Sequence, residues 1–243
     1  MIEIRQLHAL EEFTDVVRLQ QLIWGFADIE LLPLRFLVVI SRVGGHVFGA
    51  YDGAEMIGFC FAIPGIKKGC KPYLHSHMLG VLDAYRDSGI GRRLKLRQRE
   101  EALGRGIELI EWTFDPLELK NAFLNIERLG AIVRRYSVNQ YGVTASPLHG
   151  GLPTDRCYAE WWIAGDRARA RAEKCPEPPR GEPEMRIAYP LDIARIRRDD
   201  PTQAREIQKE NGEAFQSAFA RGLAVTGFER TATEGIYLLE PWQ

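Results

Sequence analysis

The chain has 243 residues, a formal net charge of −1 at pH 7, a pI near 6.5, and 45% hydrophobic and 27% charged residues. These values are typical of a globular protein that buries its own core, and the near-neutral balance argues against bulk binding to nucleic acid or to an anionic membrane. The four cysteines lack the spacing of a zinc site, and no segment resembles a signal peptide or a membrane span, so we expect a cytoplasmic protein with reduced thiols and no metal.

The first third of the chain predicts two helices followed by three strands. Apolar residues recur at near-helical spacing over residues 10–25, and a proline stands where a second helix, 33–42, would begin. An Asp-Gly pair within residues 46–65 favours a hairpin turn between two strands. Alternation along a third strand, residues 72–81, predicts that one face carries Tyr73, His75, His77, Leu79 and Val81.

The middle of the chain predicts further helices and strands. A basic helix over residues 89–103 is followed by a strand at 107–115, a helix at 116–130 and two more strands at 131–142 and 157–165. This order predicts a mixed α/β domain with a central sheet. Runs of surface charge are usually solvated, so we expect water around most basic side chains of the helix 89–103, namely Arg92, Arg93, Lys95, Arg97 and Arg99.

Composition predicts the domain organisation. Residues 1–164 form the main domain, and residues 165–184 are charged and rich in proline, as in a linker or a surface excursion. Residues 185–243 predict a strand, a helix with Asp200 as its cap and Gly222 at its end, and a closing hairpin. This last segment is small for an independent domain, so we expect an α/β extension that packs on the main domain.

Glycines and arginines cluster where the strand 72–81 gives way to the basic helix. A glycine-rich turn before a helix lets main-chain amides converge on an anion, and Gly89 and Gly91 keep side chains out of that space. Arg86, Arg92 and Arg93 add positive charge, and arginine grips phosphate through two parallel hydrogen bonds. The turn therefore favours a phosphate or pyrophosphate, although the glycines alone would also suit a tight turn. Neither the Walker nor the dinucleotide-binding pattern fits.

The pattern Arg86-x-x-Gly89-x-Gly91 after a strand ending at Val81, with "WTFDPLELKNAFLNIERLGA" downstream, resembles the acyl-CoA signature of the GNAT acyltransferase superfamily. The resemblance covers roughly residues 1–145. It implies the GNAT-like α+β fold: a mixed, mostly antiparallel central sheet flanked by helices.

The resemblance also implies how coenzyme A would bind. The strand ending at Val81 would splay from the strand beginning near Ile107, with pantetheine in the gap and pyrophosphate on the amides of residues 87–91. Asn121 would be a further cofactor contact, although an asparagine there would also suit a helix cap or turn. The implied contacts with acetyl-CoA or another acyl-CoA are Leu79, Gly80, Val81, Arg86, Asp87, Ser88, Gly89, Ile90, Gly91, Arg92 and Asn121.

Acyl transfer to an amine needs a base, and four side chains are candidates. Histidine titrates near neutral pH, so His75 and His77 suit this role, and burial can raise the pKa of a glutamate such as Glu111 toward it. Each histidine would equally suit a buried, hydrogen-bonded position, Glu111 a structural one and Asp115 the start of a helix. The histidine pair lacks a convincing third ligand for a metal.

The acid that protonates the departing thiolate is less clear from the sequence. GNAT enzymes often carry a tyrosine in the helix before the "LG" end, whereas Ile126 falls near that place here. Tyr136 or Tyr141 could substitute, or solvent could supply the proton.

These residues predict an N-acetyltransferase that moves an acetyl or other short acyl group directly from coenzyme A to an amine. A non-catalytic acyl-CoA-binding or sensing module is the alternative, and a fold that has lost its ligand is a third reading. The acceptor would be a small-molecule or protein amine, with neither nucleic acid nor membrane as a partner. The closing hairpin and the aromatic residues Tyr158, Trp161 and Trp162 offer either core packing or a homodimer surface.

Overall fold

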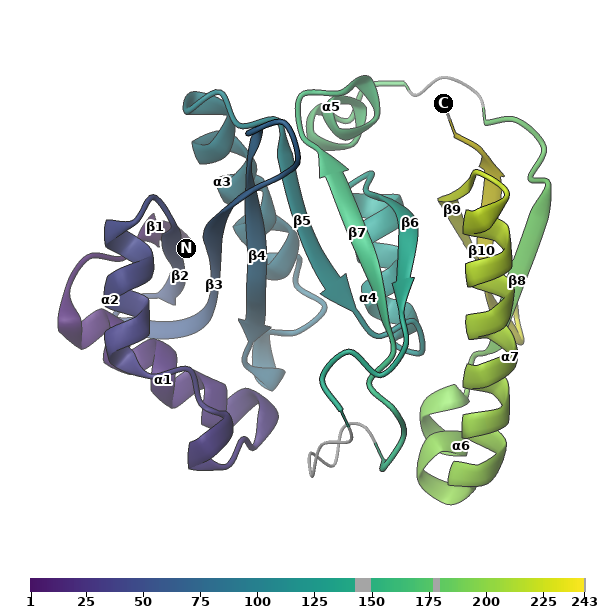
Figure 1. The fold of residues 1–243 in the computed structure, drawn as a ribbon. Helices are drawn as coiled ribbons and strands as arrows, with labels where there is room; N and C mark the ends of the chain where they lie inside the picture. The colour runs from purple at the N-terminus through teal and green to yellow at the C-terminus, as the bar shows by residue number, and fades with distance from the viewer. Residues whose placement is uncertain (143–149, 177–179, 243) are drawn as a thin grey trace. The chain divides into compact units, whose positions relative to one another are not determined.

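The computed structural model describes residues 1–142, 150–176 and 180–242. The chain folds as two compact units, Met1–Glu111 and Trp112–Gln243, and is of the mixed α/β class with mostly antiparallel strands (Figure 1). Among the described residues, none of the helices combines the length and the apolar character needed to cross a bilayer.

The first unit is built on a strand order of β1-β2-β3-β4-β5. Neighbouring strands from β1 to β4 are antiparallel, whereas β4 and β5 are parallel and pair at Leu74↔Ile110 and His75↔Glu111. β5 continues past Glu111 into the second unit. The predicted hairpin and third strand are confirmed, and β1 was not anticipated; the strands are β1 (Ile2–Gln6), β2 (His46–Asp52), β3 (Glu55–Ile66), β4 (Pro72–Val81) and β5 (Leu109–Phe114).

Helices cover both faces of this sheet. α1 (Leu10–Trp24) and α2 (Leu34–Arg42) pack on one face through a cluster that includes Phe13, Leu37 and Phe61, and α3 (Ile90–Gly104) packs on the other. The three helices predicted for this unit are confirmed, and α1 ends as expected at Gly25, whose φ is +64°. Two short 3₁₀ turns, η1 (Asp28–Glu30) and η2 (Asp83–Tyr85), precede α2 and α3.

A β-bulge interrupts β4. Ser76 pairs with Ala62 and Met78 pairs with Phe61, so His77 between them has no counterpart on β3. A bulge of this kind adds one residue to one strand, and every later side chain changes to the opposite face of the sheet.

The bulge overturns one prediction about β4. Upstream of it, His75 lies opposite Ile63 on the face covered by α1 and α2, and the ring of His77 remains on that face. Downstream of it, Leu79 and Val81 pack on the α3 side. The expectation of one shared face for Tyr73, His75, His77, Leu79 and Val81 is therefore wrong, because strict alternation fails where an extra residue is inserted.

The second unit carries the strand order β7-β6-β9-β10-β8, with antiparallel pairing wherever the register is defined. Asp200 caps α7 by accepting a hydrogen bond from the Gln203 amide at 3.0 Å, as expected. Phe215 of α7 packs against Tyr136 and Tyr237. The elements are α4 (Leu119–Phe123), the π-helical turn η3 (Leu124–Arg128), β6 (Ile132–Ser137), β7 (Arg156–Trp162), α5 (Asp166–Glu173), β8 (Met185–Pro190), α6 (Ile193–Asp199), α7 (Pro201–Ala220), β9 (Leu223–Arg230) and β10 (Glu234–Pro241).

The segment predicted as a linker or excursion, residues 165–184, contains a helix. α5 buries Ala168 and Ala170, and the Arg167 guanidinium donates to the main-chain carbonyls of Gly130 and Ile126. Small side chains permit this close packing while the charged ends of arginines reach outward or to carbonyls, which composition alone does not reveal. Residues 177–179 of this segment lie outside the described residues.

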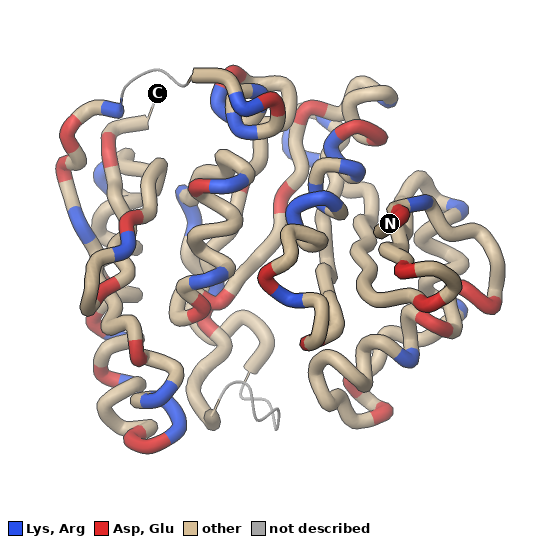
Figure 2. The backbone as a smooth tube through the Cα atoms, turned by 180° about the vertical axis from the view of Figure 1, so that it is seen from behind, with Lys and Arg blue, Asp and Glu red and all other residues tan. Residues whose placement is uncertain are grey.

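Two further features differ from expectation. The two compact units divide the chain after Glu111, a division that the sequence analysis did not anticipate, and the boundaries at 164 and 184 stay predictions. In addition, the short helix α6, which buries Ile193 and Ile196 one turn apart, was not anticipated. Charged residues of both signs are interspersed along the backbone of each unit (Figure 2).

Candidate active site

The predicted anion-binding turn lies between β4 and α3. Gly89 is the N-cap residue of α3 and has a φ of +84°, a left-handed conformation that favours glycine. Asp87, two residues earlier, is also left-handed with a φ of +60°, which aspartate tolerates better than most residues. The Ser88 hydroxyl donates to the Tyr85 carbonyl at 2.5 Å and closes the turn. Left-handed positions among helical ones are typical of main-chain concavities that bind anions.

Main-chain amides line this turn. Among the described residues, the amides of Ser88, Gly89, Ile90 and Gly91 donate to no main-chain carbonyl, as expected for the first turn of a helix. A Cβ atom built on Gly89 would meet nothing within 4 Å, so the space beside these amides is open. Gly91 differs from Gly89, because its Cβ would make an ordinary contact of 3.6 Å with Leu79.

Two arginines near the turn have exposed partners. Arg86 forms an ion pair with Asp83 at 2.8 Å in which both side chains are exposed. Exposed pairs contribute little to stability, so Arg86 can exchange this carboxylate for a phosphate at small cost. Arg93 donates to the Ile2 carbonyl at 2.8 Å and is thereby held to β1.

The last residues of β4 lead into this turn. Leu79, Gly80 and Val81 pair with β3 on one side. On the other side, the register with β5 ends at His75, so the β4 edge from Ser76 onward carries no such pair within the described part of the first unit. Gly80 is required by packing, since a Cβ there would lie 2.8 Å from Ile23 and from Trp24 of α1.

A cluster of titratable side chains lies where β4 and β5 pair. Glu111 is directly across from His75 and is buried, and its carboxylate accepts a hydrogen bond from Lys67 at 2.5 Å. Lys67 also lies over the Tyr73 ring, 4.8 Å from its centroid. The His77 ring follows, 6.1 Å from that of His75. The structure therefore brings together three of the four predicted catalytic candidates, and it adds Lys67, which the sequence analysis missed.

Both histidines of this cluster are neutral near pH 7. Burial, reinforced by the neighbouring His77, lowers the pKa of His75 to about 4. Burial also lowers the pKa of His77 below its ordinary value. His77 is nevertheless the more exposed of the two, because the bulge carries it out of the regular ladder. A neutral, accessible imidazole can accept a proton, whereas His75 is too weak a base for that task.

A buried polar network lies on the opposite face of β4. Lys95 of α3 is 2% exposed and donates from Nζ to the Ser76 hydroxyl at 2.7 Å. Ser76 donates in turn to Gln98 Oε1 at 2.9 Å. The expectation that Lys95 is solvated is therefore wrong, because Ile90, Leu94, Gln98 and Ala102 form the buried stripe of α3 and Lys95 lies beside it. That four-residue spacing was the signal available in the sequence.

The remaining predicted residues belong to the second unit. Asn121 is exposed in α4, and Ile126 is fully buried in η3. Asp115 accepts from the Leu117 amide at 2.8 Å, which supports its expected role at the start of the helical segment. The Tyr136 hydroxyl donates to Asp155 at 2.6 Å, and burial followed by nearby anionic groups raises its pKa.

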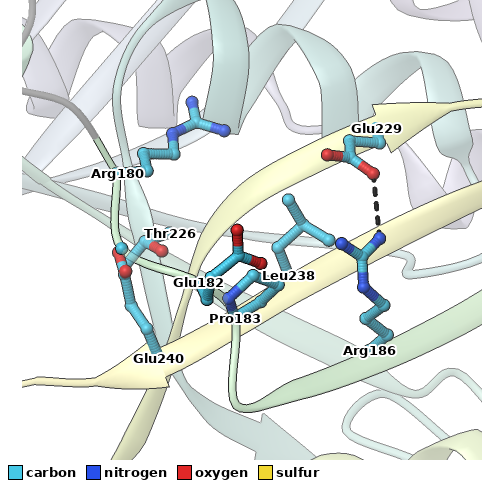
Figure 3. A pocket seen from close by; sticks show the side chains of 9 residues that line it. Arg180, Glu182, Pro183, Arg186, Thr226, Glu229, Leu238 and Glu240 are labelled. Atoms are coloured by element: carbon cyan, nitrogen blue, oxygen red, sulfur yellow. Dashed lines mark hydrogen bonds and ion pairs between the residues drawn. The ribbon is translucent and has the colours of Figure 1, made fainter.

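Two concavities in the second unit contain few predicted residues. One, of about 210 Å³, holds none of them; Figure 3 shows Arg186 pointing to Glu229, 3.0 Å away, at its edge. Tyr136 lines the other, an open groove of about 420 Å³ whose remaining lining is Arg134, Arg135, Ser137, Tyr158, Gln216 and Phe219. Within the described ranges, no group of three or more His, Cys, Asp or Glu side chains is arranged to hold a metal ion.

Comparison with known proteins identifies the region that carries the turn and the cluster. The model of the Acetyltransferase (GNAT) family matches residues 11–124. Residues 11–124 are thus similar to the acetyltransferase domain of the GNAT family, and this matched region is called the GNAT domain below. It contains α1, the bulged strand β4, the glycine turn and α3. The comparison with curated proteins found no match.

Solved structures share the fold of the GNAT domain. NAA60 of Arabidopsis thaliana, in complex with a bisubstrate analogue, has a TM-score of 0.56 and 16% identity over 68% of this chain and 100% of its own. The ribosomal-protein-S18-alanine N-acetyltransferase of Escherichia coli gives 0.52 and 17% over 68% and 97%. yncA of Salmonella typhimurium, with its cofactor acetyl-CoA, gives 0.54 and 16% over 68% and 95%. At such identities the likeness shows the fold alone.

Proposed function

We propose that the chain is an N-acetyltransferase that moves an acetyl or other short acyl group directly from coenzyme A to an amine. The observation that carries the proposal is the open turn at the start of α3, where amides from Ser88 to Gly91 donate to no main-chain carbonyl and Gly89 leaves the space beside them clear. This turn lies in the domain that matches the GNAT acetyltransferase family.

The chain's own residues fit the proposed cofactor. The amides of Asp87 to Gly91 would hold the pyrophosphate, with the guanidinium of Arg86 or Arg92 beside it. Main-chain groups of residues 79–81, on the β4 edge that does not pair with β5, would bind the pantetheine. Asn121 remains a proposed contact. Acetyl-CoA would supply the activated acyl group, and the protein would align the thioester with the amine.

His77 is the proposed general base. It would accept the proton that the attacking amine loses, because its imidazole is neutral at pH 7 and is exposed beside the bulge. The Lys67–Glu111 pair would hold the β3–β4 connection against β5 beside His77. Main-chain amides near the bulge would stabilise the tetrahedral oxyanion.

The proposed transfer uses no covalent enzyme intermediate. Cys60 is the cysteine of β3 opposite Leu79, and its thiol is buried with a pKa raised by burial to about 12. It therefore stays protonated and inaccessible as a nucleophile. The departing thiolate would take its proton from solvent or from Tyr136. The raised pKa of Tyr136 and its bond to Asp155 favour solvent.

Titration calorimetry with acetyl-CoA, followed by a thiol-release assay over a panel of small amines and N-terminal peptides, tests the proposal. We expect micromolar binding and turnover with at least one acceptor. Absence of binding at high micromolar acetyl-CoA would refute the function.

A non-catalytic acyl-CoA-binding or sensing module is the second candidate. Two observations favour it. Ile126 is buried near the place where GNAT enzymes often carry a tyrosine that can protonate the thiolate, and the pKa of His75 is low. It predicts acetyl-CoA binding without thiol release for any amine in the panel. Any turnover that depends on His77 would exclude it.

A further inference from the structure

Two polar residues occupy the inner face of α3 where apolar residues would be expected. Lys95 and Gln98, one turn apart, are 2% and 0% exposed, and they lie among Leu94 and Ala102 on the side that packs on the sheet. Removing an ammonium group from water is costly, so a lysine at such a position needs hydrogen-bond partners inside the protein. An apolar side chain of similar length would fill the same space without that cost.

The partner of this pair is the residue that precedes the bulge. Ser76 Oγ accepts from Lys95 Nζ at 2.7 Å and donates to Gln98 Oε1 at 2.9 Å, so its hydroxyl is fixed to α3 from two directions. Ser76 is also the last β4 residue in register before His77 is inserted. The network therefore ties α3 to one strand position, the one at which β4 changes its facing pattern.

The position of the bulge decides what β4 presents to the proposed site. If the inserted residue moved by one position, the side chains between the old and new bulge would exchange faces. If Ser76 became the inserted residue, His77 would pair with Ala62 and leave the α1/α2 face, whereas the pairs from Met78 with Phe61 onward would be unchanged. Packing holds the strand beyond the bulge, since a Cβ at the place of Gly80 would lie 2.8 Å from Ile23 and from Trp24, but it does not hold the exposed His77.

We propose that Lys95 is a positioning residue, which acts through Ser76 to hold the β4 bulge at His77 and thereby keeps the His77 side chain on the face that acyl transfer requires. The proposal rests on the acetyltransferase function proposed above. Lys95 touches neither the proposed cofactor nor the acceptor, and it changes activity only by way of the strand.

The variants Lys95→Met, Ser76→Ala and their double mutant test this role, with Arg99→Met as the matched control. Arg99 is one turn further along α3, and its replacement removes the same charge. We expect kcat/KM to fall at least tenfold in each single variant and no further in the double mutant, because both act through one contact. Arg99→Met should stay within threefold of wild type.

Two further readouts separate a positioning role from loss of fold. Lys95→Met should be at least as stable as wild type at pH 7, since an apolar residue replaces a buried charge, and yet be impaired. Amide hydrogen exchange over residues 76–81 should accelerate in Lys95→Met and Ser76→Ala but not in Arg99→Met. Exchange needs no turnover, so it judges the inference even if no acetylation is found. Unchanged exchange in this segment, or additive losses in the double mutant, would overturn it.

Discussion

His75 of β4 and Glu111 of β5 lie directly across from each other in the parallel register, and Lys67 holds the Glu111 carboxylate from the β3–β4 connection. The β3–β4 connection and β4 thus meet β5, which lies far along the sequence, at the point where the pairing of β4 with β5 ends. Substitution of one member of this cluster at a time can separate a role in stability from a role in catalysis.

The ion pair between Lys67 and Glu111 should contribute to stability. Lys67→Met removes a partner of a buried carboxylate, and we expect the free energy of unfolding to fall by about 1–3 kcal/mol. Lys68→Met is the matched control, since this exposed neighbour should change stability by less than about 0.5 kcal/mol. Urea denaturation measures both. Addition of Glu111→Gln to Lys67→Met should recover part of the loss, and a loss that is additive instead would contradict the pairing.

The left-handed turn at Gly89 should be required for acetyl-CoA binding. Gly89→Ala adds a Cβ beside the amides, and we expect the dissociation constant for acetyl-CoA, measured by calorimetry, to rise at least tenfold. Gly53→Ala is the control, because Gly53 in the β2–β3 turn also has a positive φ, +59°, and open space around its Cβ position. Both variants should lose about 1–2 kcal/mol of stability from backbone strain. Equal affinities for acetyl-CoA in the two variants would show that the turn does not hold the cofactor.

Replacement of the proposed base should affect chemistry and leave binding intact. His77→Gln should lower kcat about 100-fold at pH 7 while the acetyl-CoA dissociation constant stays within twofold. Its residual rate should rise with pH, as more of the acceptor amine loses its proton without help. His8→Gln, an exposed histidine ahead of α1, serves as the control. A variant at position 77 with wild-type kcat would remove the base assignment.

Burial of Lys95 predicts a pH dependence of stability. Desolvation lowers its pKa to about 7, well below the ordinary value of 10.5; Cys60 on β3 acts in the opposite direction, and His46 on β2 and His75 on β4 are the other titratable groups that its charge reaches. Between about pH 7 and 10 the unfolded chain therefore keeps a proton that the folded chain has released.

The free energy of unfolding therefore rises with pH over that window, by at most about 1.4 kcal/mol per pH unit. The cost of burying the Lys95 ammonium group is largest below pH 7. Between pH 7 and 9 the unfolding free energy of wild type should therefore rise relative to that of Lys95→Met, by up to this amount per pH unit. Titrating groups that are not coupled to Lys95 cancel in the difference. Urea midpoints at pH 7, 8 and 9 supply the measurement, and a constant difference would mean that Lys95 keeps its ordinary pKa.

Much of the first unit could be predicted because its signals are local. Periodic apolar residues and terminal glycines define α1 and α3, and an Asp-Gly pair defines the β2–β3 hairpin. The glycine turn could also be predicted, because a few consecutive residues set both the left-handed conformation at the start of α3 and the unpaired amides of its first turn. The GNAT resemblance of this region depended on the same short motif and was confirmed by the family match over residues 11–124.

The tertiary structure alone determined three features: the burial of Lys95, the reversal of faces after His77, and the pairing of Lys67 with Glu111. A bulge arises from the fit between two strands, and the cost of burying a charge depends on partners that other segments supply. Sequence by itself determined α1, α2, α3, the β2–β3 hairpin and the glycine turn, because each is set by interactions among near neighbours in the chain. Which polar groups meet across the sheet depends on packing between distant segments, and no single stretch of residues encodes it.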